Sequence, residues 1–176
     1  MRNRLTRESL LALMRGLARS ANPKQHYRVY LVGGGTAVLA GWRESSIDAD
    51  LYARQDEIFR DVQKIKDRLN LNIEFARPED FVPPLEESET RHVLVETVGG
   101  VSFYHYDPYA QLLSKVVRGF ARDVVDANAF VASGMVDPER FRNLVQDIPE
   151  SAYSRYPRLS AQAVRAAVDD FLSTLT

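Results

Sequence analysis

The sequence predicts an α+β fold in which an α/β-type N-terminal half is followed by a C-terminal helical segment. Up to residue 106, short β-rich runs alternate with amphipathic helical runs, whereas from residue 107 onward the pattern is helical throughout. Two β-rich runs also flank Gly99-Gly100, which is the signal of a two-residue hairpin. We therefore expect a core over residues 1–106 and a helical segment over residues 107–176, packed together as a single structural unit.

Composition excludes several classes of protein. The 176 residues, 45% hydrophobic and 27% charged, suit one globular domain, and the absence of cysteine excludes disulfides and thiolate metal sites. No apolar run reaches the roughly 20 residues that span a bilayer, and Arg15 and Arg19 interrupt the first apolar stretch. We expect no membrane association, no signal peptide and a cytoplasmic location. The net charge of −1 argues against an extensive nucleic-acid surface but allows a local basic patch.

Caps, apolar periodicity and turn residues predict the elements of the first half. In order, these are a helix capped by Thr6 and ended by Asn22-Pro23, a strand over 27–32, a short helix from the glycines to about residue 42, a strand over 48–52, an amphipathic helix over 56–69, a strand over 72–75, a loop over 77–90 and a hairpin over 92–106.

The same signals predict four helices in the second half. Asp107-Pro108 and Asp137-Pro138 each combine an N-cap with a proline at the first helical position. Gly119 and Gly134 are expected to end the first two helices. The expected ranges are 108–118, 121–133, 138 to just before Pro149, and a last helix capped by Ser160.

A glycine turn joins the first strand to its short helix. The turn comprises Gly33, Gly34 and Gly35 and is followed by Thr36. A dinucleotide-binding fingerprint would need a glycine where Val38 stands, and no Gly-Lys-Ser/Thr of a Walker loop follows. The turn still offers backbone N–H groups to an anion. From the glycines alone, a tight strand-to-helix turn that binds no ligand is an equally good interpretation.

Two carboxylates follow on the next strand. Side chains alternate faces along a strand, so Asp48 and Asp50 project from the same side, with their Cα atoms about 7 Å apart. Neighbouring carboxylates disfavour joint ionisation unless a cation lies between them. Mg²⁺ prefers a few carboxylates together with phosphate oxygens. The alternative is the solvated face of an edge strand.

Together these residues resemble the nucleotidyltransferase superfamily with the polymerase-β-like fold. Its pattern is a hydrophobic residue, Gly-Gly or Gly-Ser, about a dozen residues, and Asp-hydrophobic-Asp/Glu-hydrophobic. Here Val32-Gly33-Gly34 precedes Asp48-Ala49-Asp50-Leu51 by thirteen residues, and Gly34-Gly35 with twelve is the alternative register. Ala49 is smaller than the residue usually found there. The finer pattern is similar to a bacterial branch of small nucleotidyltransferases and abortive-infection type toxins; it comprises Thr36-Ala37, Gly41, Arg43 and Ser46-Ile47-Asp48.

The resemblance implies a small mixed β-sheet flanked by helices, with a C-terminal helical segment. It implies transfer of a nucleoside monophosphate from an NTP, ATP among them, to an acceptor, with release of pyrophosphate. Mg²⁺, or Mn²⁺ in its place, is expected at Asp48 and Asp50, with Glu74 as a third ligand or as the base. The expected nucleotide-binding residues are Gly33, Gly34, Gly35, Thr36, Arg43, Ser46 and Lys115.

In the helical segment the resemblance implies that Lys115 contacts the triphosphate and that Asp123 orients this lysine or the acceptor. Surface ion pairs along the helices are the alternative for these charges. The aromatic run from Phe103 to Tyr106, with Tyr109, either stacks a base or belongs to the core, and the core is favoured. The expected acceptor is tRNA, a protein or a small molecule. A toxin role with a cognate antitoxin, and an inactive nucleotide- or partner-binding protein, remain open.

Overall fold

The computed structural model describes residues 1–175, which form two compact units. The first unit comprises Met1–Arg77 and Val93–Tyr106; the second comprises Pro78–His92 and the described residues from Asp107 onward. The chain therefore crosses from one unit to the other three times. Helices combine with a mixed β-sheet, so the predicted α+β class is confirmed.

The first unit is built on a five-stranded mixed sheet with the strand order β5-β4-β2-β7-β6. Strand β2 pairs with β4 in antiparallel and with β7 in parallel orientation, β5 runs parallel to β4, and β6 is antiparallel to β7. Gly99 has a φ of 57° in the predicted β6–β7 hairpin. The strands are β2 Tyr27–Val32, β4 Asp48–Tyr52, β5 Asn72–Phe75, β6 Val93–Val98 and β7 Val101–His105.

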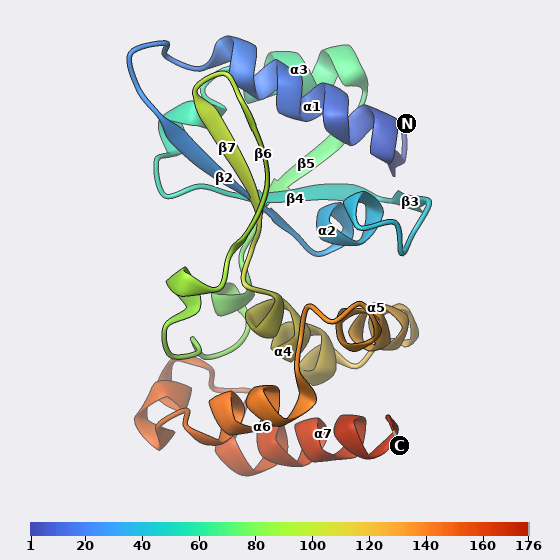
Figure 1. Cartoon of the computed structure of the whole chain (residues 1–176), viewed down its shortest axis with the longest axis vertical. Helices are drawn as coiled ribbons and strands as arrows, with labels where there is room; N and C mark the ends of the chain where they lie inside the picture. Colours follow the sequence, from blue (N-terminus) through green and yellow to red (C-terminus); the bar gives the residue numbers. More distant parts are fainter. Residues whose placement is uncertain (176) are drawn as a thin grey trace. The chain divides into compact units, whose positions relative to one another are not determined.

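Two helices, α1 (Arg7–Ser20) and α3 (Val62–Leu69), lie side by side over one face of this sheet (Figure 1). Thr6 caps α1 as predicted, its hydroxyl accepting from the Ser9 N–H. The hydrophobic core lies between these helices and the strands, and most of its residues are less than 5% exposed. Its members include Leu10, Leu13, Met14 and Leu17 from α1, Ile65 from α3, and Val29, Leu31, Ala49, Leu51, Ile73 and Phe103 from the strands.

The prediction of one helix over residues 56–69 is wrong. The segment consists of a 3₁₀ turn, η1 (Asp56–Phe59), followed by α3. Ile58 on η1 and Ile65 on α3 are both buried in the same core. Apolar residues therefore recur at helical spacing across the break because both pieces cover one surface. Helical spacing of apolar residues therefore indicates a shared buried face and does not require a continuous helix.

Two short strands were not predicted. Strand β1 (Leu5–Thr6) pairs in antiparallel orientation with β3 (Ser45–Ser46), which forms a separate two-stranded sheet. Between β2 and β3, the short helix α2 comprises only Gly34–Leu39 and ends before the expected residue 42. Gly41 beyond it has a φ of 84°, a left-handed conformation that suits glycine.

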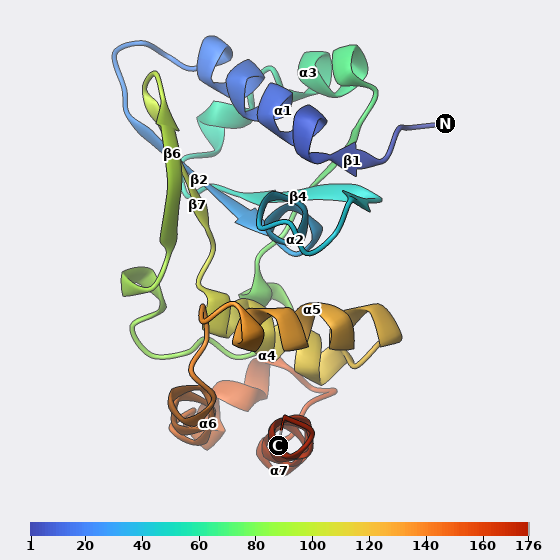
Figure 2. The same cartoon turned by 45° about the vertical axis from the view of Figure 1, so that its right-hand side comes forward.

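The second unit consists mainly of four α-helices. Helices α6 and α7 run side by side, and α4 contacts both α5 and α7 (Figures 1 and 2). Asp107, Asp137 and Ser160 cap α4, α6 and α7 as predicted. The α-helices are α4 Pro108–Arg118, α5 Ala121–Ala132, α6 Pro138–Gln146 and α7 Ala161–Ser173; the 3₁₀ turns are η2 Pro78–Asp80, η3 Ser88–Thr90 and η4 Glu150–Arg155.

Asp107 joins segment 78–92 to the start of α4. Its side chain is fully buried and accepts hydrogen bonds from the Tyr109 N–H at 2.9 Å and from the Ser88 hydroxyl at 2.9 Å. The guanidinium of Arg91 donates to the same carboxylate through Nη2 at 2.7 Å. The Asp107 N–H in turn donates to Nδ1 of His92 at 2.9 Å. One buried charge therefore organises both segments of the second unit.

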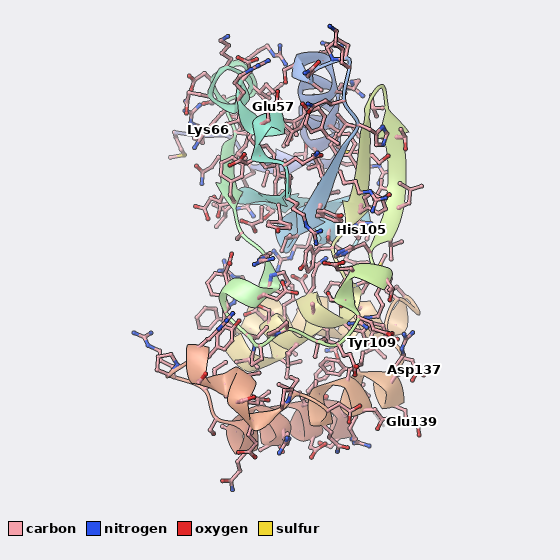
Figure 3. The ribbon with its side chains drawn as sticks, turned by 90° about the vertical axis from the view of Figure 1, so that its left-hand side faces the viewer. Glu57, Lys66, His105, Tyr109, Asp137 and Glu139 are labelled. Carbon is pink, nitrogen blue, oxygen red and sulfur yellow. The ribbon has the colours of Figure 1, made fainter. Side chains whose placement is uncertain are left out.

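Tyr109 extends this connection to α6. Its hydroxyl accepts from the Asp137 N–H at 3.0 Å, and both residues are labelled in Figure 3. In the part of the chain that the structure describes, no helix is both long enough and apolar enough to cross a membrane.

Candidate active site

The two predicted carboxylates lie on one face of β4. Ala49 and Leu51 are buried in the core beneath the helices, so the alternate residues Asp48 and Asp50 project from the opposite face. Both side chains are half-buried. Because Ala49 and Leu51 are fixed by core packing, the face to which the two aspartates project is fixed as well.

Strand β5 brings a third acidic residue to the same face. In the parallel register, Asp48 lies opposite Asn72 and Asp50 lies opposite Glu74. The Asn72 amide donates a hydrogen bond to Asp48 Oδ1 and a longer one, 3.4 Å, to Glu74 Oε1. Glu74 is exposed. The first unit thus places Asp48, Asp50 and Glu74 at adjoining positions, with Asn72 orienting Asp48.

The donor chemistry of this face suits a hard divalent cation, because all three acidic groups offer oxygen ligands. Across residues 1–175, however, no group of three or more His, Cys, Asp or Glu side chains is arranged to hold a metal ion. Two strand carboxylates with phosphate oxygens from a substrate form the kind of ligand set that Mg²⁺ uses. Asp48 and Asp50 therefore fit such an ion, and Glu74 is their neighbour.

The glycine turn lies directly against these residues. Gly33 has a φ of 55°, and a Cβ added there would be 3.0 Å from Asp50 Oδ2. A Cβ on Gly34 would be 2.0 Å from Ser46 Oγ, whereas one on Gly35 would meet its nearest neighbour at 3.8 Å. The close approaches that exclude side chains therefore occur at Gly33 and Gly34. This contact brings the turn beside Asp50.

The contact between Gly34 and Ser46 gives the first prediction. Gly34→Ala is expected to destabilise the protein by roughly 1–3 kcal/mol, because the added methyl group overlaps Ser46 Oγ and Cβ, at 2.0 and 2.7 Å. Urea unfolding followed by circular dichroism measures the change. Adding Ser46→Gly removes both overlapping atoms and should restore part of the loss; Gly35→Ala is the matched control. Equal losses at Gly34 and Gly35 would contradict this geometry.

Thr36 is fully buried at the first turn of α2. Its hydroxyl donates to the Leu31 carbonyl at 3.1 Å and lies 3.1 Å from Nδ1 of His105. Because the hydroxyl proton is directed to Leu31, Nδ1 of His105 carries the proton in this pair. Thr36 therefore ties the glycine turn to β2 and β7, and His105 lies at the end of β7 (Figure 3).

Burial lowers the pKa of His105 to about 4, from its ordinary value of 6.5. The unfolded chain binds the proton near pH 6.5 and the folded chain only near pH 4, so the free energy of unfolding falls as the pH drops between these values. The expected loss is about 3 kcal/mol. Urea unfolding between pH 7.5 and 4 measures it. His105→Asn should remove this slope, whereas His26→Asn, at an exposed histidine, should keep it.

The other predicted phosphate-binding residues of the first unit follow the glycine turn in the sequence. Ser46 is 8% exposed on β3, beside Gly34. Arg43 is half-buried beyond α2, and its backbone N–H donates to the Ala37 carbonyl at 3.3 Å. Both belong to the first unit. Their roles in phosphate binding stay predictions.

Lys115 and Asp123 belong to the second unit, where they form a buried ionic cluster. Lys115 is 6% exposed, and its Nζ lies 2.7 Å from Asp126 Oδ2 and 3.6 Å from Asp123 Oδ1. Arg118 Nε donates to Asp123 Oδ2 at 2.7 Å. Burial raises the pKa of Asp123, but hydrogen bonds and charge from Arg118, with the charge of Lys115, bring it below its usual value. These pairs join α4 to α5 and are not surface pairs along one helix.

Sequence reasoning missed two residues on the carboxylate face. Tyr30 on β2 and Tyr52 on β4 lie opposite each other in the antiparallel register. Tyr52 follows Asp50 at the next position of the same face, so the strand period alone contained this signal. The position of Tyr30 beside it depends on the pairing of two strands that are separated by α2 and β3.

The chain matches a family of known proteins over most of its length. A family model described as a nucleotidyltransferase of unknown function (DUF6036) matches residues 8–175. No curated protein and no solved structure matches the chain.

Proposed function

The chain belongs to this nucleotidyltransferase family of unknown function, and from that premise we propose that it transfers a nucleoside monophosphate from an NTP to an acceptor hydroxyl or phosphate. The second product of the proposed reaction is pyrophosphate, and the proposed metal is Mg²⁺ or Mn²⁺. The observation that carries the proposal is that Asp50 lies opposite Glu74 in the mixed sheet and beside Gly33 of the glycine turn.

The residues of this face have separate roles in the proposed reaction. The Asn72 amide holds Asp48, so that its second oxygen keeps a fixed direction. Gly33 and Gly34 bring the main chain up to Asp50 and Ser46, where a larger residue would clash. A divalent ion bound by Asp48 and Asp50 would neutralise charge on the phosphates.

The proposed step forms one bond to the α-phosphorus of the NTP and breaks another. An oxygen of the acceptor attacks the α-phosphorus, and the bond from this phosphorus to the oxygen that bridges to the β-phosphorus breaks. The proton of an acceptor hydroxyl passes to the Glu74 carboxylate, which is exposed and therefore accessible. Pyrophosphate takes the electron pair of the broken bond and leaves.

Lys115 and Asp123 enter the proposal through the resemblance alone. A lysine near the triphosphate would act as a point charge on the phosphate oxygens. Within the second unit, Asp126 and Asp123 hold the Lys115 ammonium at 2.7 and 3.6 Å. These two carboxylates already compensate the charge of Lys115 within the second unit.

Labelled nucleotides test the proposal directly. The full chain is incubated with each of four α-³²P-NTPs, Mg²⁺ or Mn²⁺, and a cell lysate, and the products are separated into RNA, protein and small molecules. We expect label in one of these fractions together with release of pyrophosphate. NTP binding without pyrophosphate release would favour the inactive, nucleotide-binding alternative. Label in tRNA, with growth arrest on expression, would favour the toxin–antitoxin role.

A further inference from the structure

Three tyrosines form a row across three neighbouring strands of the first unit. Tyr30 on β2 lies directly opposite Tyr52 on β4 and directly opposite Tyr104 on β7. The ring centroids of Tyr30 and Tyr52 are 6.0 Å apart, and those of Tyr30 and Tyr104 are 5.5 Å apart. Tyr30 is buried, whereas the outer residues Tyr52 and Tyr104 are half-buried and retain exposed surface.

This row adjoins the carboxylates. Strand alternation places Tyr52 on the same face as Asp50, with Cα atoms about 7 Å apart. Tyr106 packs edge-on against two members of the row. Its ring centroid lies 5.7 Å from that of Tyr30 and 5.9 Å from that of Tyr52. On this face of β4, the aromatic residues therefore begin with Tyr52, at the next side-chain position after the proposed metal ligand Asp50.

Two arginines supply positive charge at the ends of the row. The guanidinium of Arg28, an exposed residue, lies 5.8 Å from the centroid of Tyr104. Arg77 lies 5.0 Å from the centroid of Tyr52 and donates a hydrogen bond to its hydroxyl at 3.2 Å. Aromatic rings for bases and arginines for phosphates are the usual components of surfaces that bind single-stranded nucleic acid.

The row lies on the opposite side of Asp50 from the residues proposed to face the phosphates. Along β4 and the segment before it, Ser46 and Asp48 precede Asp50 and lie beside Gly34, whereas Tyr52 follows. In phosphoryl transfer the attacking and leaving oxygens are roughly in line through the phosphorus. Pyrophosphate leaving on the glycine side therefore places the acceptor on the tyrosine side.

We propose that this row binds the acceptor, and that the acceptor is a single-stranded nucleic acid whose bases stack on Tyr52 and Tyr104, while the buried Tyr30 supports both rings from between them. The inference rests on the proposed function and specifies its acceptor. Stacking on aromatic side chains tolerates any base. The net charge of −1 suits a short single-stranded end better than a long duplex, because few phosphates need to be neutralised.

Binding measurements with the full chain test the inference. The probes are a 5′-fluorescein single-stranded octanucleotide and the same backbone with abasic sites, followed by fluorescence anisotropy at fixed salt. The variants are Tyr52→Leu and Tyr104→Leu, with Tyr52→Phe and Tyr104→Phe as conservative partners. Phe75→Leu is the matched control, because Phe75 is 54% exposed and packs on Phe59 from the helix layer. Circular dichroism confirms that each variant is folded.

We expect the octanucleotide to bind at least about tenfold tighter than its abasic form, since stacking on each base contributes this much. Each Leu variant should lose most of that ratio, whereas the Phe variants and Phe75→Leu should keep it. Arg28→Gln should weaken both probes and flatten the dependence on salt.

Equal binding of the two probes, or a ratio that the Leu variants leave unchanged, would overturn the inference. Binding of an NTP and of inorganic tripolyphosphate by the same Leu variants is the second comparison. If the Leu variants weaken binding of the NTP alone, the row binds the base of the donor nucleotide, and the inference is overturned. Since the readout is binding, it is independent of transfer. A chain without transfer activity can still show base-dependent binding, and an active chain can fail to show it.

Discussion

Asp48→Ala and Asp50→Ala are each expected to lower nucleotide transfer by about a thousandfold or more. Each change removes a proposed metal ligand, and a bound cation stabilises phosphoryl transfer by several kcal/mol, with every 1.36 kcal/mol worth a factor of ten in rate. Release of labelled pyrophosphate from the preferred NTP measures the effect. Asp48→Asn keeps the shape of the side chain but removes its charge, and should lose nearly as much activity.

The fold should tolerate these changes. Asp48 and Asp50 are half-buried on the face opposite the hydrophobic core, so removing either side chain opens no cavity in the core. Urea unfolding should therefore show little change in stability. Asp56→Ala, at an exposed carboxylate of the same unit, is the matched control and should retain full activity. Undiminished turnover in both Asp48 and Asp50 variants would refute the proposed site.

The largest effect on stability is expected at Asp107. Asp107→Ala should lower the free energy of unfolding by about 3–5 kcal/mol, because it leaves the Arg91 guanidinium buried without its carboxylate. It also removes the N-cap of α4 and the acceptor of the Ser88 hydroxyl. Urea unfolding monitored by the helical circular dichroism signal measures the loss.

Two further variants separate the causes. Asp107→Asn keeps an oxygen for the Tyr109 N–H and should lose less than Asp107→Ala. Asp67→Ala breaks a 2.8 Å pair between Asp67 and Arg2 at the surface, where solvent screens both charges, and should change the free energy of unfolding far less than Asp107→Ala does. Losses of similar size for Asp107→Ala and Asp67→Ala would contradict the importance of burial.

Local signals predicted most elements correctly. Thr6, Asp107 and Ser160 cap helices because each places a side-chain oxygen near N–H groups within three residues. Gly119 ends α4 with a φ of 68°, a conformation that glycine adopts readily. Such signals involve neighbours in the chain, so a single sequence contains them in full.

Features that depend on distant partners were not predictable in the same way. Pairing of β1 with β3 joins residues about 40 positions apart, and a two-residue strand has no period to detect. Lys115 pairs with Asp126 across two helices, whereas sequence spacing favoured pairs along one helix. The opposition of Asp50 and Glu74 likewise depends on the register of β4 and β5. The alternation of side chains along a strand predicted that Asp48 and Asp50 share a face, but it could not predict which residues of other strands lie beside them.

The three crossings of the chain have a consequence for any attempt to divide the protein. Cutting after Tyr106 would leave Pro78–His92 attached to the sheet unit while removing the remainder of the unit to which that segment belongs. Arg91 would then be separated from Asp107, which accepts its guanidinium hydrogen bonds. Shortening the gene from its 3′ end therefore leaves residues 78–92 without the unit to which they belong, and an independent sheet unit would require residues 78–92 to be replaced by a short linker.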